Sequence, residues 1–187
     1  MVKVEMKISL AWRLLYPLPL VLVTSMGKKG KPNIIPLAWS MPISFKPPLI
    51  AIGVAGKRFS HELIGDSGEF VVNIPPRELL DQVLFCGSTS GRSVDKFKET
   101  GLTSLLSKKV RAPGIKECVA HLECKLSEKF QPGDHTVFVG EVVACSVDEG
   151  VFDEKSVPNL KRMKPLLEVG GNYYATTGKR FRAKRPY

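Results

Sequence analysis

Short apolar runs alternate with breaks rich in proline and glycine along the first half of the chain, a pattern typical of strands joined by turns. Three such runs, predicted as buried strands, lie at residues 20–26, 49–54 and 70–74. A fourth run, residues 33–45, contains Pro36 and Pro42. Proline cannot donate a ladder hydrogen bond, so this strand is expected to be bulged, broken or at a sheet edge.

Three short helices are predicted between or after these strands. Ser60 is the expected N-cap of a helix that runs through Ile64 and ends in the glycine-containing segment 65–68. A second helix follows Pro76, ends at Gly87 and presents one apolar face formed by Leu79, Leu80, Val83 and Leu84. Ser93 is the expected cap of a third helix, which closes at Gly101.

The second half of the chain reads as a long hairpin. Residues 117–130 alternate between apolar and polar, which predicts that His121, Glu123 and Lys125 face water. A turn at 132–134 leads into a returning strand at 136–147. Together these elements predict a mainly β fold, a closed or partly closed Greek-key-like antiparallel barrel with a few short helices, forming one domain over residues 1–178.

Length and charge narrow the class of protein. The 187 residues contain no apolar run near the roughly 20 needed to span a bilayer, and prolines 17 and 19 interrupt the apolar segment 14–23 without a cleavage site, so a cytoplasmic protein is expected. The net charge is +10, and half of this excess lies in a basic tail, residues 179–187. Such a tail is usually solvated, and nucleic-acid binding through it is the alternative.

The four cysteines form no CxxC pair, so no metal site is predicted. Cys118 and Cys124 are expected to be buried thiols that act as small apolar side chains. Hydrolytic motifs of the GxSxG or HExxH type are also absent from the sequence.

Three segments carry candidate chemistry. Arg58, Phe59 and Ser60 combine a guanidinium, a hydroxyl and the amides of a helix start, which suits a phosphate, although an ordinary capped helix has the same composition. The loop 86–97 contains small and hydroxylated residues and Lys96, but lacks the ending of a nucleotide-triphosphate loop, and a polar loop without a ligand is the alternative. His135 follows the turn of the long hairpin, where it either contacts a ligand or is simply exposed.

The order of these segments resembles that of the flavin reductase-like FMN-binding family, which includes flavoredoxins and ferric reductases of the archaeal type. The likeness covers residues 12–178. The motifs that carry it are PLVLVTS at 19–25, GKPNI at 30–34, WSMPISFKPP at 39–48, KRFSHELI at 57–64, FVVN at 70–73, SGRSVDKF at 90–97 and GDHTVFVGEV at 133–142. Ser60 stands where the family more often has threonine, which retains the hydroxyl.

The resemblance implies a split barrel that forms a homodimer, with FMN near the subunit interface. It implies that the broken strand lies along the isoalloxazine ring and that the segment around Arg58 holds the phosphate. The cofactor-binding residues implied in this way are Trp39, Ser40, Met41, Pro42, Ile43, Ser44, Arg58, Phe59, Ser60, Ser90, Arg92 and Lys96. His135 would face the flavin or the incoming electron donor and is the candidate catalytic residue.

The implied function is an NAD(P)H-dependent oxidoreductase that passes electrons through FMN to free flavin, ferric complexes or a protein acceptor. The alternative is a flavoredoxin-like carrier that keeps FMN bound and has no NAD(P)H activity of its own. A nucleic-acid-binding module is the third hypothesis. NADH and NADPH are both compatible with the sequence, as are a permanently bound and an exchangeable FMN.

Overall fold

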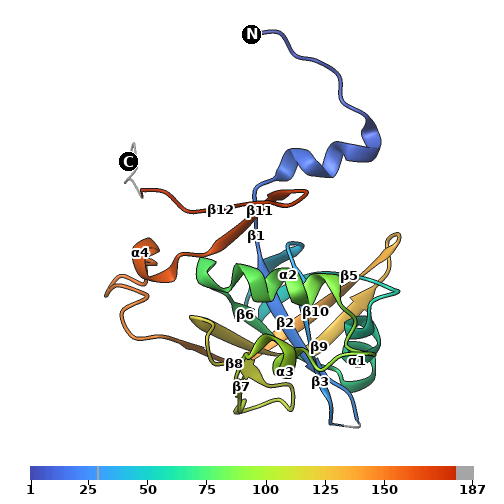
Figure 1. Cartoon of the computed structure of the whole chain (residues 1–187), viewed down its shortest axis with the longest axis vertical. Helices are drawn as coiled ribbons and strands as arrows, with labels where there is room; N and C mark the ends of the chain where they lie inside the picture. Colours follow the sequence, from blue (N-terminus) through green and yellow to red (C-terminus); the bar gives the residue numbers. More distant parts are fainter. Residues whose placement is uncertain (29, 180–187) are drawn as a thin grey trace.

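The computed structural model describes residues 1–28 and 30–179, and its centre is a seven-stranded antiparallel sheet that curls into a split barrel (Figure 1). The strand order is β3-β2-β6-β9-β10-β5-β4. The bounds of these strands are β2 Val21–Met26, β3 Pro32–Leu37, β4 Ser40–Phe45, β5 Pro48–Ala55, β6 Glu69–Ile74, β9 Ala120–Phe130 and β10 His135–Val147. The predicted mainly β fold is confirmed.

Smaller elements surround the barrel. A three-stranded sheet joins β1 (Leu18–Pro19), β11 (Leu166–Gly170) and β12 (Tyr173–Thr176), and a two-stranded sheet joins β7 (Ser104–Leu105) and β8 (Gly114–Ile115). The helical segments are η1 Ile8–Leu15, α1 Phe59–Ser67, η2 Arg77–Leu79, α2 Leu80–Ser88, α3 Lys96–Thr100 and α4 Leu160–Met163. The N-terminal segment with η1 extends away from the barrel, and β11 and β12 lie between η1 and the barrel (Figure 1).

The run that contains Pro36 and Pro42 is broken into β3 and β4, which occupy opposite edges of the seven-stranded sheet. The break falls at Ala38 and Trp39, where the Trp39 carbonyl accepts a hydrogen bond from the Gly53 amide at 2.8 Å. The register of β4 against β5 also shifts between Pro42 and Ser44. Both prolines therefore lie on edge strands, where a missing ladder donor is tolerated.

The barrel interior is filled by aliphatic and aromatic side chains from facing strands. Phe70 on β6 and Phe138 on β10 are fully buried, together with Ile52 and Val54 on β5. Gly140 allows this packing, because a Cβ there would lie 2.5 Å from the Phe70 ring and 2.8 Å from Cys124. Each fully buried side chain of this size contributes about 1.5–3 kcal/mol.

The helix starts differ from those predicted. Helix α1 begins at Phe59 with Arg58 as its N-cap, so Ser60 is a buried residue of the first turn rather than the cap. The helix also continues past Gly65 and ends at Gly68, whose φ of 66° is the left-handed conformation that favours glycine. Helix α3 is capped by Asp95, whose carboxylate accepts from the Lys98 amide, and not by Ser93.

The polar face predicted for residues 117–130 is wrong at its beginning. His121 and Glu123 are only 8% exposed, because the segment that contains β7 and β8 covers this end of β9. The buried groups are satisfied there: the Glu123 carboxylate accepts from the amides of Lys108 and Lys109, and His121 Nε2 lies 2.7 Å from the Ile115 carbonyl. Period-two alternation identifies a face but not what covers it.

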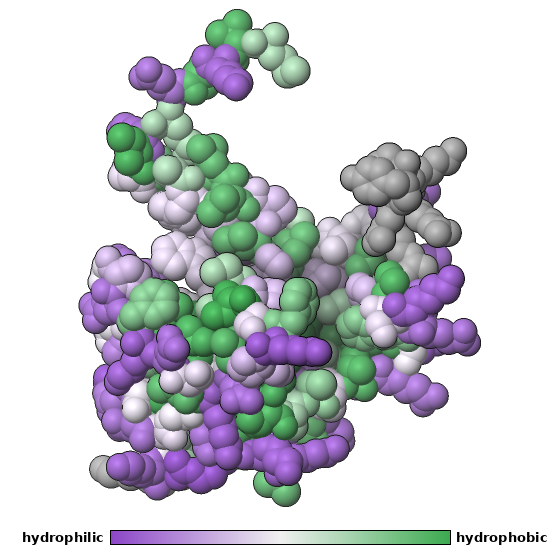
Figure 2. Space-filling view, turned by 180° about the vertical axis from the view of Figure 1, so that it is seen from behind, coloured by the Kyte–Doolittle hydropathy of each residue, from purple (hydrophilic) through white to green (hydrophobic). Residues whose placement is uncertain are grey.

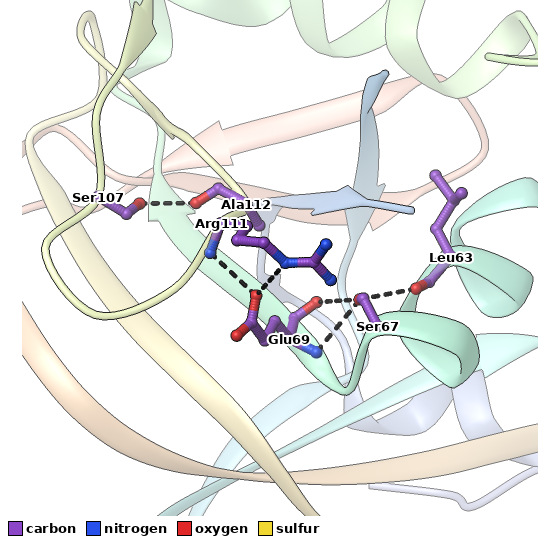
Figure 3. Close-up of polar contacts among 6 residues, drawn as sticks. All are labelled: Leu63, Ser67, Glu69, Ser107, Arg111 and Ala112. Atoms are coloured by element: carbon purple, nitrogen blue, oxygen red, sulfur yellow. Dashed lines mark hydrogen bonds and ion pairs between the residues drawn. The ribbon is translucent and has the colours of Figure 1, made fainter. Parts of the chain in front are cut away.

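The same covering segment is anchored to β6 (Figure 3). The Glu69 carboxylate accepts a hydrogen bond from the Arg111 amide at 2.9 Å and lies 3.4 Å from the Arg111 guanidinium. Within the segment, the Ser107 hydroxyl donates to the Ala112 carbonyl at 2.6 Å. The contacts hold the segment against β6 and β9, on a part of the sheet away from the pocket described below.

Cys118 and Cys124 are buried, as predicted, and all four cysteines are free thiols. Within residues 1–28 and 30–179, no helix is long and apolar enough to cross a membrane, and no cluster of histidine, cysteine and acidic side chains could hold a metal ion. The predicted basic tail lies outside the described residues, apart from Lys179.

Candidate functional site

A pocket of about 1020 Å³ lies against one edge of the barrel. It is bordered by β3, the start of α1, the loop that follows α2, and the β11–β12 hairpin. Six of the predicted site residues line it: Arg58, Phe59, Ser60, Ser90, Lys96 and His135. Its volume is at the upper end of the range for small-molecule sites, so it has room for a ligand of cofactor size.

Strand β3 runs along the pocket and defines its two ends. Asn33 lies at one end, next to Ser60 of α1, and Leu37 lies at the other, on the part of the strand that pairs with the start of β2. Leu37 is four positions further along the extended strand than Asn33, which corresponds to about 13 Å. We call the end at Asn33 the cationic end and the end at Leu37 the hairpin end.

Lys96 is the most buried charge at the cationic end, with 4% of its surface exposed. Its Nζ donates to the carbonyls of Ile34 at 2.7 Å and Cys86 at 2.6 Å. Burial lowers the pKa of Lys96, Cys86 partly counteracts this effect, and the nearby positive charge of Arg58 adds to it. Among the described residues, neither cation forms an ion pair with a carboxylate. Two adjacent cations without a carboxylate partner favour an anionic ligand.

Helix α1 adds further donors to this end. Arg58 is its N-cap, and the first amides of a helix lack intrahelical partners and carry the positive end of the helix dipole. The Ser60 hydroxyl accepts from Asn33 Nδ2 at 2.8 Å, so β3 fixes its position. A phosphate is the group that such a combination of guanidinium, ammonium, hydroxyl and helix amides suits best.

Gly91 brings the loop after α2 into close contact with β3. A Cβ at this position would overlap the Asn33 side-chain oxygen and lie 3.2 Å from the Phe59 ring. Asn33 is not among the residues predicted from the sequence, and its Oδ1 is buried without a hydrogen-bond partner among the described residues. An asparagine ahead of two isoleucines in a buried strand is a signal that could have identified it.

Arg92 lies outside the pocket lining. Its guanidinium is 4.7 Å from the centre of the Phe59 ring and forms a 2.8 Å ion pair with Glu62. The side chain therefore braces the loop against α1, and its charge is already paired. Ser90 does line the pocket, and its hydroxyl accepts from the Arg92 amide at 3.3 Å.

Trp39 and the β4 residues Ser40 to Ser44 are the other predicted contacts, and none of them lines the pocket. On this edge strand the side chains of Met41 and Ile43 are 60% and 44% exposed. Trp39 reaches the pocket indirectly, because its ring centre lies 4.6 Å from that of His135. The resemblance implied that this strand borders the ligand, and in the single chain it faces outward.

His135 is held from two sides at the pocket wall. Its Nδ1 lies 2.7 Å from the Asp134 carboxylate, which fixes the ring and leaves Nε2 as the other polar atom. Hydrogen bonding to His135 lowers the pKa of Asp134. On the outer side of Trp39, Trp12 of the N-terminal segment lies 6.2 Å away between ring centres, so an aromatic row connects this segment to the pocket.

The hairpin end has a different lining, which sequence reasoning also missed. Leu20 and Leu37 form an apolar floor, and Glu168, Asn172 and Tyr174 come from the β11–β12 hairpin. Burial raises the pKa of Glu168, while the nearby Arg13 counteracts this effect. This hairpin is distant in sequence from every other part of the pocket, so no local motif indicates it.

Comparison with known proteins assigns the family. The model of the flavin reductase like domain matches residues 13–177. The chain belongs to the flavin reductase-like family. This membership confirms the resemblance found in the sequence, and it covers the barrel together with the whole pocket.

Several solved structures share the fold of this chain. Flavoredoxin of Desulfovibrio vulgaris is 32% identical, with a TM-score of 0.84 over 96% of this chain and 97% of that one. Flavoredoxin from Methanosarcina acetivorans is 31% identical, with a TM-score of 0.86 over 98% and 95%. An FMN-binding protein from Thermus thermophilus, solved with 1-cyclohex-2-enone, is 28% identical, with a TM-score of 0.84 over 98% and 99%.

Proposed function

We propose that this protein binds FMN in the pocket and acts as an oxidoreductase, passing electrons from NADH or NADPH through FMN to free flavin, ferric complexes or a protein acceptor. The observation that carries the proposal is the pair of cations at the cationic end, Lys96 and Arg58, which lack a carboxylate partner among the described residues. A family whose solved members include an FMN-binding protein supplies the identity of the cofactor.

The donor set and shape of the pocket fit FMN. Arg58, Ser60, Lys96 and the first amides of α1 would hold the phosphate, with Ser90 nearby. The apolar floor at the hairpin end, about 13 Å away along β3, would take the ring. FMN, when bound, supplies the capacity to accept a hydride and to release electrons singly or in pairs.

The chain's own residues would bind FMN, orient it and shield it. Main-chain carbonyls hold Lys96 in place before any ligand arrives, so the phosphate site is preorganised. His135, fixed by Asp134 and Trp39, lies on the wall where a donor or acceptor would approach. The proposal needs no side chain that acts as an acid or base, which agrees with the absence of hydrolytic motifs from the sequence.

Visible absorption spectroscopy tests the proposal. Purified protein is expected to take up one FMN per chain and to lose the flavin absorbance when NADH or NADPH is added under anaerobic conditions. Protein that takes up no FMN at near-physiological salt would contradict the proposal. Loss of FMN binding in Lys96→Met, with binding retained in Lys98→Met on the same helix, would locate the phosphate, because Lys98 is exposed.

The second candidate function is a flavoredoxin-like carrier that holds FMN tightly and receives electrons from a protein instead of NAD(P)H. It is favoured by the two solved flavoredoxins that share this fold at 31% and 32% identity. Flavin that stays oxidised in the presence of NADH and NADPH, but is reduced by dithionite, would favour the carrier. Nucleic-acid binding through the basic residues 179–187 is the weaker alternative, and salt-sensitive binding that is lost on deleting them would support it.

We also propose that the protein is a homodimer. The N-terminal segment carries exposed apolar side chains where it extends from the barrel (Figure 2). Edge strand β4 adds Met41, Ile43 and Phe45, the last almost fully exposed. Apolar surface along an unpaired strand edge favours contact with another chain. Light scattering coupled to size exclusion tests this, and a mass near 20.6 kDa would contradict it.

A further inference from the structure

The pocket lining contains two carboxylates, which differ in exposure and in their partners. Asp134 is exposed and is paired with His135 at 2.7 Å. Glu168, on β11, is partly buried, and among the described residues no group donates a hydrogen bond to it or forms an ion pair with it. A partly buried carboxylate without a partner is unfavourable unless a cation or a donor reaches it.

The groups around Glu168 do not neutralise it fully. Arg13 of η1 is the nearby cation, but it is not in ion-pair contact with Glu168 and its guanidinium lies 5.0 Å from the Trp12 ring centre. Tyr16 and Tyr174 are the other titratable neighbours. Burial, followed by the charge of Glu168, raises the pKa of both tyrosines, so they remain neutral. Glu168 is thus available to a positively charged ligand group.

The pocket therefore has opposite charges at its two ends. Lys96 and Arg58 lie at the cationic end, and Glu168 lies at the hairpin end, beyond the apolar floor. If the phosphate and ring of FMN occupy the pocket as proposed, a donor ring stacked on the flavin would lie at the hairpin end. A positive charge that develops on this ring would lie near the Glu168 carboxylate.

We propose that Glu168 stabilises the positive charge that the nicotinamide ring of the proposed donor acquires when it donates a hydride. Donation breaks the C4–H bond of the dihydronicotinamide, and the hydrogen and both bonding electrons pass to the flavin. The nicotinamide ring, neutral before the step, is left with one positive charge. A carboxylate beside it lowers the energy of the charged state more than that of the neutral one. This inference rests on the proposed FMN site.

Ligand binding without turnover tests this role of Glu168. The FMN-loaded, oxidised protein is titrated with NADP⁺, and separately with tetrahydro-NADPH, whose ring is neutral and cannot donate a hydride. Titrations with NAD⁺ and its tetrahydro analogue run in parallel, and flavin absorbance reports binding. In Glu168→Gln the dissociation constant of the oxidised nucleotide is expected to rise about tenfold, which corresponds to about 1.4 kcal/mol. That of the neutral analogue should change by less than about twofold.

Two controls keep the test specific. Glu128→Gln removes the same charge from an exposed position on β9 outside the pocket, and should leave both constants unchanged. In the unmutated protein, acidification should weaken binding of the oxidised nucleotide, because protonation removes the charge of Glu168. The Asp134–His135 pair and Arg13 also face this region, so the pH effect must disappear in Glu168→Gln to be assigned to Glu168.

Equal weakening of both ligands in Glu168→Gln, or no weakening, would overturn the inference. So would a protein that binds FMN but neither oxidised nucleotide. Failure of the proposed function has a different signature, because the protein would then take up no FMN at all. FMN uptake by Glu168→Gln itself verifies that this variant is folded.

Discussion

At the cationic end of the pocket Lys96 is buried and held by two main-chain carbonyls, whereas at the hairpin end Glu168 is partly buried and has no hydrogen-bond partner among the described residues. The first end is built from α1, α3 and β3, which the barrel positions, together with a loop that touches β3 at Gly91. The second end is a hairpin that, among the described strands, pairs only with the two-residue strand β1. The difference indicates a preformed anchor at one end and an adjustable contact at the other.

The largest effect is expected from replacing Lys96 with methionine. The substitution removes a charge from the anchor and leaves the carbonyls of Ile34 and Cys86 without their donor. FMN affinity should fall by about 100-fold, and stability by about 1–3 kcal/mol. Fluorescence titration of FMN and urea unfolding measure the two effects. Equal FMN affinity in Lys96→Met and Lys98→Met would show that the anchor lies elsewhere.

Gly91→Ala should disturb the same end through shape alone. The added methyl group would overlap the Asn33 side chain, so the loop must move away from β3. A loss of about 1–3 kcal/mol in unfolding free energy is expected, together with weaker FMN binding. Gly133→Ala is the matched control, because nothing lies near its Cβ position. Unchanged stability and FMN affinity in Gly91→Ala would contradict the close approach of this loop.

Arg58 and Arg92 allow a direct comparison between a free and a paired guanidinium. Arg58→Ala should weaken FMN binding by about 1.5–3 kcal/mol, the range for hydrogen bonds to charged groups, and leave the fold intact. Arg92→Ala breaks an exposed ion pair with Glu62 and should cost at most about 1 kcal/mol of stability, with a smaller effect on FMN. Isothermal titration with FMN distinguishes the two, and a larger effect in Arg92→Ala would reverse the assignment.

The smallest effect concerns stability at the hairpin end. Because the pKa of Glu168 is raised in the folded protein, its ionised form is less favourable there than in the unfolded chain. Glu168→Gln should therefore raise the melting temperature slightly at pH 7, by less than about 2 °C. The difference should shrink as the pH falls and the native carboxyl becomes protonated. Calorimetry at several pH values measures this, and a lower melting temperature at pH 7 would contradict it.

Much of the fold follows from patterns that lie close together in the sequence. The apolar runs at 20–26, 49–54 and 70–74 correspond to β2, β5 and β6, and the prolines at 36 and 42 anticipate the break between β3 and β4. Helix caps were less predictable. Arg58 and Asp95, and not the two serines, occupy the N-cap positions of α1 and α3, and helix ends are the least predictable part of a helix.

The pocket residues also differ in how well the sequence predicts them. Six predicted residues line it, and they belong to motifs in which the relevant side chains are neighbours in the sequence, such as Arg58 and Ser60. Arg92 belongs to a motif of the same kind but is paired with Glu62, a contact between residues 30 positions apart. Glu168 and Asn33 were missed because their importance depends on segments that meet only in the folded chain.

The sequence by itself determined the β-rich architecture, the family and the residue types at the cationic end, since these depend on local periodicity and on short motifs in a fixed order. The tertiary structure decided which polar groups are buried. Lys96 lies within reach of the carbonyls of Ile34 and Cys86, and Glu168 lies opposite the cations. The physical reason is that desolvation and charge pairing depend on distances in space, which the linear order of residues does not specify.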